Sequence, residues 1–120
     1  MSGASWRVVP SLLSRNLEST EHFYTALGFV RTGGSSLSGW VELRRDTFVL
    51  QFYAEPPVGT PTTPIMSGTV YCHLESINEL ASEWAGRVSF EWGPETMDYG
   101  MREFAIRDPD GYLIAFAAPA

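Results

Sequence analysis

The stretch SFEWGPETMDYGM combines flat aromatic rings with negative charge. Three carboxylates and two rings fall close together in it: Glu91, Trp92, Glu95, Asp98 and Tyr99. Carboxylates attract cations, and aromatic rings stack on flat ligands or bind cations over their faces. The stretch therefore favours a groove that receives a planar, positively charged molecule. The same residues would also suit a solvated loop.

Two further side chains, Gln51 and His73, could take part in binding or in catalysis. Both lie in apolar runs that predict strands, and we expect both to face the groove. His73 could line the groove wall, recognise a ligand, bind a metal together with Gln51, or act as a general base near Glu75. Cys72 lies between Tyr71 and His73 in an apolar run, which predicts a buried small hydrophobe rather than a reactive thiol.

The composition of the 120-residue chain fits one domain with a hydrophobic core, since 44% of the residues are hydrophobic and 18% are charged. The formal net charge of −6 argues against a nucleic-acid partner and would attract a cationic ligand. The one cysteine excludes an intramolecular disulfide. No apolar stretch approaches the length of a membrane span, and no secretory signal is evident. We therefore expect a cytoplasmic protein with no membrane partner.

The chain divides into two similar halves, about 6–56 and 68–118, joined by a Pro- and Thr-rich linker at about 57–67. Each half is expected to contain one helix, predicted at Leu17–Ala26 and Ile77–Ala85, with Asn16 and Ser76 as caps. Hydrophobic alternation predicts strands at Trp6–Leu13, Gly39–Arg44, Thr47–Ala54, Thr69–Leu74, Arg102–Arg107 and Tyr112–Ala117. Two βαβββ modules of this kind predict an α+β fold whose mixed sheets curl around a cleft.

The segment REFAIRDPDGYLIAF predicts a strand, a tight turn and a second strand. Pro109 suits the second position of a β-turn and Gly111 the fourth. Phe104 and Ile106 mark the apolar face of the first strand. The opposite face of the two strands offers no catalytic group, because it carries Ala105, Leu113, Ala115 and Ala117.

The two halves, the helix FYTALGF and the RDPDG turn together resemble the glyoxalase/bleomycin-resistance/dioxygenase superfamily, also called vicinal oxygen chelate. The resemblance covers about Val8 to Ala117. Within the superfamily, the chain is most similar to bleomycin-binding resistance proteins in the stretches VPSLLSRNLESTEHFYTALGF, GWVELRRDTFVLQFYAEP, HLESINELASEW and YGMREFAIRDPDG. In those proteins an aromatic side chain just before a glycine stacks on the planar bithiazole of the drug. The resemblance assigns this place to Tyr99, where drug binders often have Trp.

Enzymes of the superfamily hold a divalent metal with His, Gln or Glu side chains that project into the cleft. The resemblance carries these positions to Val9, Gln51, Thr69 and Ala115. Val9 and Ala115 have no donor atom, and Thr69 is a rare ligand at best. A divalent metal in a protein requires several imidazole or carboxylate ligands. We therefore expect a domain without a metal, a cofactor or catalytic residues.

The resemblance and the residues together predict a non-catalytic protein that binds and sequesters a bulky, partly planar cation of the bleomycin kind and so confers resistance. Alternation leaves Trp40 either in the groove or against a helix. The candidate ligand-binding residues are Trp40, Gln51, Tyr53, Tyr71, His73, Glu91, Trp92, Asp98, Tyr99 and Met101. The resemblance also implies a homodimer in which each groove draws on both chains. The alternatives are a metal-dependent glyoxalase- or dioxygenase-type enzyme with a displaced ligand set on Gln51 and His73, and a sensor or structural dimer with the same fold.

Overall fold

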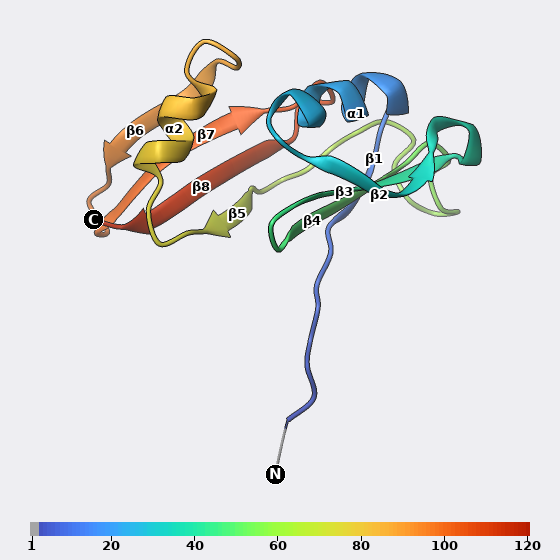
Figure 1. The fold of residues 1–120 in the computed structure, drawn as a ribbon. Helices are drawn as coiled ribbons and strands as arrows, with labels where there is room; N and C mark the ends of the chain where they lie inside the picture. The colour runs from blue at the N-terminus through green and yellow to red at the C-terminus, as the bar shows by residue number, and fades with distance from the viewer. Residues whose placement is uncertain (1–2) are drawn as a thin grey trace.

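The computed structural model describes residues 3–120, which form two four-stranded mixed sheets and two α-helices (Figure 1). The first sheet, sheet A, has the order β1-β4-β3-β2 and consists of β1 (Ser11–Leu13), β2 (Val30–Ser35), β3 (Trp40–Arg45) and β4 (Phe48–Tyr53). Sheet B has the order β5-β8-β7-β6 and consists of β5 (Val70–His73), β6 (Phe90–Thr96), β7 (Met101–Arg107) and β8 (Leu113–Pro119). In each sheet the first strand pairs in parallel with the last, and the other pairs are antiparallel.

The helices are α1 (Leu17–Ala26) and α2 (Asn78–Trp84), and a short 3-10 turn, η1 (Ser36–Ser38), precedes β3. The predicted bounds of α1 are confirmed. Its cap is the side chain of Asn16, which accepts a hydrogen bond from the Ser19 backbone N–H at 3.0 Å. For α2 the predicted cap is wrong, because the helix starts after Ile77 with no side-chain cap.

The strand expected at Trp6–Leu13 is limited to Ser11–Leu13, and the residues before it extend away from the body of the molecule (Figure 1). Trp6 and Val8 are each 87% exposed, because pairing with β4 goes no further back than the carbonyl of Pro10. Two strands, β2 and β6, were not expected. Both pair irregularly with their neighbours, at bulges that break the apolar alternation by which strands are predicted.

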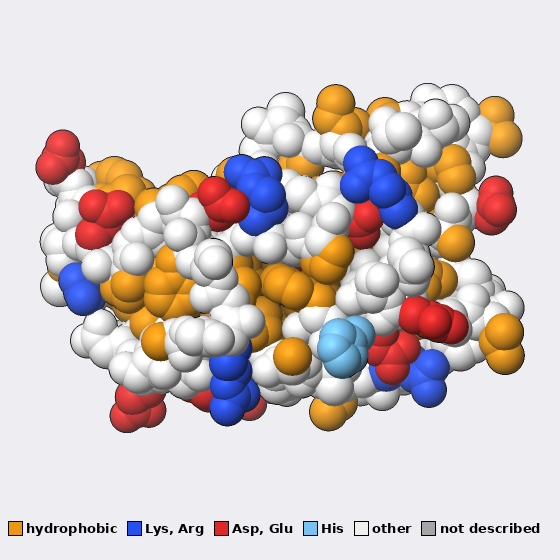
Figure 2. Space-filling model, turned by 90° about the horizontal axis from the view of Figure 1, so that it is seen from above, with side chains coloured by type: hydrophobic (Ala, Val, Ile, Leu, Met, Phe, Trp, Pro, Cys, Tyr) orange, Lys and Arg blue, Asp and Glu red, His pale blue; other side chains and the backbone are white. Residues whose placement is uncertain are grey.

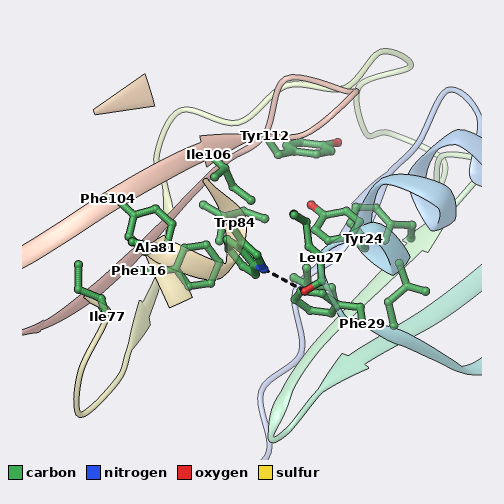
Figure 3. Close-up of a cluster of buried hydrophobic side chains, with 14 of the residues drawn as sticks. Tyr24, Leu27, Phe29, Ile77, Ala81, Trp84, Phe104, Ile106, Tyr112 and Phe116 are labelled. Atoms are coloured by element: carbon green, nitrogen blue, oxygen red, sulfur yellow. Dashed lines mark hydrogen bonds between the residues drawn. The ribbon is translucent and has the colours of Figure 1, made fainter. Parts of the chain in front are cut away.

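The core lies on the helix side of both sheets and is shared between the two modules. Tyr24, Phe29 and Phe52 from the first module and Trp84, Phe104 and Phe116 from the second belong to one buried cluster (Figure 3). The Trp84 indole N–H donates to the Leu27 carbonyl at 3.2 Å, which bridges the modules directly. The same carbonyl accepts a hydrogen bond from Arg45, whose guanidinium also binds Glu83 through two contacts of 2.7 and 2.8 Å.

The turn at Asp108–Gly111, called here the acidic turn, joins the second module to the first. The predicted turn forms, with the Gly111 N–H donating to the Asp108 carbonyl at 3.0 Å. Asp108 accepts a 2.9 Å hydrogen bond from the Tyr24 hydroxyl on α1, and Asp110 accepts one of 3.0 Å from the backbone N–H of Arg15. Both acids are nearly buried, and burial raises the pKa of Asp108. The acidic turn is therefore an inter-module contact.

The α+β fold with two βαβββ modules is confirmed. The two sheets lie side by side and do not close around a shared cleft within the described chain (Figure 1). The radius of gyration, 15.3 Å, exceeds the roughly 14 Å typical of a compact domain of this length. Of the helices that the structure describes, none has the length and apolar character needed to cross a membrane.

Candidate functional site

Each sheet has a face opposite the helices, called here its open face. On the open face of sheet B, four residues form a row across the strands: Trp92 on β6, Ala105 on β7, Ala115 on β8 and Tyr71 on β5. The two alanines are fully buried. Their small size leaves room for the large side chains on either side of them to converge over the middle of the sheet.

Those side chains converge on Glu103, and together they form what we call the Glu103 cluster: Tyr71, Trp92, Tyr99 and Glu103. The Tyr71 hydroxyl donates to Oε1 of Glu103 at 3.0 Å, and the Trp92 indole N–H donates to Oε2 at 3.0 Å. The Tyr99 hydroxyl also donates to Oε1. Glu103 is only 1% exposed. Three aromatic side chains thus surround one buried carboxylate.

The cluster holds the carboxylate in its charged form. Burial raises the pKa of Glu103, but the hydrogen bonds from Tyr99, Trp92 and Tyr71 outweigh it, and the pKa lies below its ordinary value of 4.5. The hydrogen bond to the carboxylate raises the pKa of Tyr99, and burial, followed by the same kind of bond, raises that of Tyr71. At neutral pH a negative carboxylate therefore lies beneath neutral phenols.

Glycine at position 93 allows β6 to approach β7 closely enough for Trp92 to reach the Glu103 carboxylate. Gly93 has φ of +76°, and a Cβ atom there would lie 2.1 Å from the Glu103 carbonyl oxygen and 2.9 Å from Cα of Phe104. Both neighbours are backbone atoms and cannot rotate away. A larger residue would therefore force β6 outward and move Trp92 away from the carboxylate.

The other predicted residues of the second module lie around the cluster or apart from it. The His73 ring lies edge-to-face with Tyr71, at a centroid distance of 5.1 Å, on the same open face. Met101 begins β7 and is half-buried. Glu91 forms an ion pair with Arg107 at 3.0 Å, and Asp98 is exposed in the turn after β6. Of the sequence-predicted residues, Tyr71, Trp92 and Tyr99 are those that bind Glu103.

The predicted residues of the first module lie on sheet A. Gln51 donates through Nε2 to Oε1 of Glu42 at 3.2 Å, and the Thr32 hydroxyl donates to Oε2 at 2.7 Å. Trp40, 43% exposed, pairs with Tyr53 across the two central strands. Gly33 leaves space for the Trp40 ring, because a Cβ atom there would lie 3.0 Å from it. The structure thus places Trp40, Gln51 and Tyr53 on one sheet and the Glu103 cluster on the other.

The positions at which superfamily enzymes hold a metal do not suit one in this chain. Val9 and Ala115 are hydrocarbon side chains, and Thr69 is an exposed hydroxyl before β5. Gln51 uses its amide nitrogen on Glu42, and His73 belongs to the other sheet. Within residues 3–120 no group of three or more His, Cys, Asp or Glu side chains is arranged to bind a metal ion.

A cavity of about 510 Å³ lies on the helix side of the sheets. Aromatic side chains line it, among them Phe29, Phe48, Trp84 and Phe116, and of the predicted site residues only His73 reaches it. Figure 2, viewed from the helix side, shows hydrophobic side chains gathered on this face between charged ones. This cavity is therefore distinct from the Glu103 cluster.

Sequence reasoning missed Glu103, although it is the centre of the aromatic cluster. Its neighbour in sequence, Arg102, donates to the Asn78 side chain at 3.0 Å. A signal was available in the alternation. Glu103 shares a face with Ala105, and a charged residue beside small ones in the middle of a sheet requires partners that reach it from other strands.

Comparisons with known proteins agree with this architecture. The chain is 29% identical over 117 residues to a bleomycin resistance protein of Klebsiella pneumoniae, covering 90% of this chain and 88% of that protein. A bleomycin resistance determinant encoded on the transposon Tn5 superimposes with a TM-score of 0.72 at 26% identity, covering 96% of this chain and 98% of that one. A bleomycin-binding protein complexed with bleomycin gives a TM-score of 0.73 at 24% identity, with coverage of 97% and 100%.

The model of one protein family also matches most of the chain. The match runs over residues 8–116 and includes both sheets, both helices and the acidic turn. Together with the two βαβββ modules, this match shows that the chain belongs to the Glyoxalase/Bleomycin resistance protein/Dioxygenase superfamily.

Proposed function

We propose that this protein binds and sequesters a bulky, partly planar cation of the bleomycin class in the cytoplasm and makes or breaks no bond in it. The observation that carries the proposal is the Glu103 cluster, where partly exposed rings lie over a buried negative charge. A flat cation would gain both stacking and electrostatic attraction there. The likeness to a bleomycin resistance protein of Klebsiella pneumoniae supports this ligand class.

The proposal includes a homodimer in which each groove is formed by two chains. In one chain the open faces of sheets A and B lie side by side and do not face each other. In the proposed dimer each of them would form one wall of a groove. A second copy related by a two-fold axis would place sheet A of one chain opposite sheet B of its partner, twice. Light scattering on the purified protein should give twice the mass of one 13.3 kDa chain.

Titration calorimetry with metal-free bleomycin tests the binding. We expect saturable heat at micromolar concentration and one ligand per chain. Tyr99→Ala should weaken binding several-fold to about tenfold, because it removes one stacking ring. Glu18→Gln, at an exposed residue of α1 on the helix side, should bind like the unmodified protein and is the matched control. Absence of heat with bleomycin would leave the fold standing and reject this ligand.

A metal-dependent enzyme is the alternative within the same superfamily, and its test is independent of the drug. Such an enzyme would need ligands other than those at Val9, Thr69 and Ala115, and a displaced set on Gln51 and His73 would have to join side chains from two sheets. Metal analysis of protein purified without chelator should find no stoichiometric Fe, Mn, Ni or Zn. A stoichiometric metal that is lost in a His73→Ala variant would overturn the non-catalytic proposal.

A further inference from the structure

Glu103 differs from the ion-paired acids of the chain in the partners that it has. Arg7 contacts Glu42 at 3.3 Å, Arg45 contacts Glu83 at 2.7 Å, and Arg107 contacts Glu91 at 3.0 Å. Glu103 is far more buried than these acids, yet its hydrogen-bond donors are a Trp and two Tyr side chains, all neutral. In the part of the chain that the structure describes, no arginine or histidine forms an ion pair with it.

Neutral donors satisfy the hydrogen-bonding capacity of a carboxylate but leave its charge in place. The hydrogen bonds keep Glu103 ionised, and a cation brought close to it would add an electrostatic attraction that neutral donors do not supply. The two arginines nearest in sequence are engaged elsewhere, Arg102 with Asn78 and Arg107 with Glu91. A cation that pairs with this charge would therefore come from outside the cluster.

The rings above Glu103 provide the surface at which such a cation could lie. Tyr99 is 63% exposed and Tyr71 is 38% exposed, while both hydroxyls are directed inward to the carboxylate. A phenol that donates to a carboxylate gains electron density in its ring, which strengthens the attraction of the ring face for cations. The arrangement suits an organic cation with little need for hydrogen bonds, such as an alkylated nitrogen or sulfur.

We infer that Glu103 is the charge-selecting residue of this groove: it acts through Tyr71 and Tyr99 to make their exposed ring faces a subsite for an organic cation. This inference rests on the proposed function for the location of the groove, and it adds the chemical class of the group that the cluster accepts. Glu103 is a positioning residue here, because it is covered by the rings and affects the ligand through them. Stacking alone would accept neutral and charged rings equally, whereas this subsite prefers the charged one.

A pair of probes of equal shape and different charge tests the inference on the full-length protein. N-Methylquinolinium is a flat cation, and 1-methylnaphthalene is its neutral counterpart. Binding of each is measured by calorimetry and by the shifts of the Tyr71 and Tyr99 ring resonances. The unmodified protein should bind the cation about tenfold more tightly than the neutral probe. Equal binding of the two probes would overturn the inference without any variant.

Glu103→Gln and Glu18→Gln then separate the local charge from the net charge. Each variant removes one negative charge, from −6 to −5, and Glu18 is exposed in the first turn of α1, on the helix side of the sheets. Glu103→Gln should lose most of the tenfold preference and retain binding of the neutral probe, while Glu18→Gln should retain the preference. Tyr71→Phe keeps the ring and the carboxylate but removes the hydrogen bond between them, so it should lower the preference in part. Equal loss of preference in the Glu103 and Glu18 variants would assign the effect to general charge and reject the inference.

The outcomes also distinguish this inference from the proposed function. If bleomycin does not bind but the quinolinium preference depends on Glu103, the subsite stands and the ligand class of the proposed function fails. If bleomycin binds equally to the unmodified protein and to Glu103→Gln, the proposed function stands and the subsite fails. If Glu103→Gln instead weakens the dimer and leaves probe binding unchanged, the counter-charge belongs to a second copy and the inference is rejected.

Discussion

The equivalent rows of the two sheets are filled in opposite ways. In sheet A the row reads Gly33, Glu42, Gln51 and Ser11, with large polar side chains in the middle and small residues at the edges. In sheet B the row reads Trp92, Ala105, Ala115 and Tyr71, with small residues in the middle and aromatic rings at the edges. The two sheets thus share a backbone arrangement but differ in their side chains. Large polar side chains lie in the middle of the row in sheet A, whereas large aromatic ones lie at its edges in sheet B.

This inversion explains why each sheet holds its carboxylate differently. Glu42 lies in the middle of its own row, where Gln51 and Thr32 reach it from neighbouring strands and Arg7 neutralises it. Glu103 lies beside the small residues of its row, so its partners are rings that extend across them. Sheet A therefore presents a neutralised polar surface, and sheet B presents rings over an unneutralised charge.

The largest expected effect comes from introducing a Glu at equivalent central positions of the two rows. Ala115→Glu places a second negative charge in a fully buried position near Glu103 and should lower the free energy of unfolding by about 3 kcal/mol or more. Gln51→Glu, at the equivalent half-buried position, should cost less, on the order of 1 kcal/mol, through loss of the bond to Glu42. Urea denaturation measures both, with Ala115→Ser as a size control. Similar losses for the two Glu variants would contradict the inversion.

Glycine substitutions in β2 and β6 should separate stability from binding. A Cβ atom at Gly34 would lie 2.1 Å from the Trp40 carbonyl oxygen, and one at Gly93 would lie 2.1 Å from that of Glu103. Both glycines have positive φ, so replacement by Ala should cost about 2 kcal/mol at either site. Gly93→Ala should also weaken quinolinium binding, which Gly34→Ala should not. Unfolding curves and calorimetry give the two readouts, and a binding loss confined to Gly34→Ala would contradict the assignment of the site to sheet B.

The pH dependence of unfolding should separate Glu103 from the acidic turn. The pKa of Glu103 lies below 4.5, so its contribution to stability is complete above about pH 4.5 and is lost as the pH falls through the folded-state pKa. Glu103→Gln should cost about 1–2 kcal/mol near pH 7, and that cost should shrink towards about pH 3.

The contribution of Asp108 to stability should change with pH in the opposite direction. Its pKa is raised above 3.8, so its contribution is complete below about pH 3.8 and falls as the pH rises through the folded-state pKa. Asp108→Asn should therefore cost more near pH 3 than near pH 7. Denaturation of the two variants at several pH values checks both slopes. If the cost of both substitutions changed with pH in the same direction, the pKa shift of one of the two carboxylates would have the opposite sign to that described.

The smallest expected effect concerns Arg7, which neutralises Glu42. Its side chain is 59% exposed and the contact is 3.3 Å long, so Arg7→Ala should leave the free energy of unfolding unchanged within error. Cation binding should be unaffected if the subsite is on sheet B. A gain in quinolinium affinity in this variant would show that an exposed Glu42 can attract the same probe, and would weaken the contrast between the two sheets.

Much of the architecture could be predicted because it depends on local signals. The α1 helix was predicted at its observed bounds with Asn16 as its cap, and the turn at Asp108–Gly111 followed from its Pro and Gly. The strands β2 and β6 were missed because their bulges interrupt alternation. The role of the acidic turn was missed too, since its partners Tyr24 and Arg15 are more than eighty residues away in sequence.

The candidate site was predicted in part, because some of its residues lie in recognisable local stretches of the sequence. Tyr99 and Trp92 lie in one aromatic stretch and could be found by composition, and Tyr71 lies on a recognisable strand. Their common partner could not be found locally, because the bond between Trp92 and Glu103 depends on the register of β6 against β7 and on the bulge at Gly93. A carboxylate with three distant donors is visible only after the strands are paired.

The buried cluster shared by the two modules bears on how the duplicated halves can change over evolutionary time. Trp84 of the second half donates a hydrogen bond to the Leu27 carbonyl of the first. The ring centroids of Phe48 and Phe116 lie 6.1 Å apart across the boundary between the halves. Either half produced alone would expose a hydrophobic surface and would tend to aggregate. A single repeat would therefore need a second copy to cover this surface, whereas the open faces, which this contact leaves untouched, can differ between the halves as a polar wall and an aromatic one.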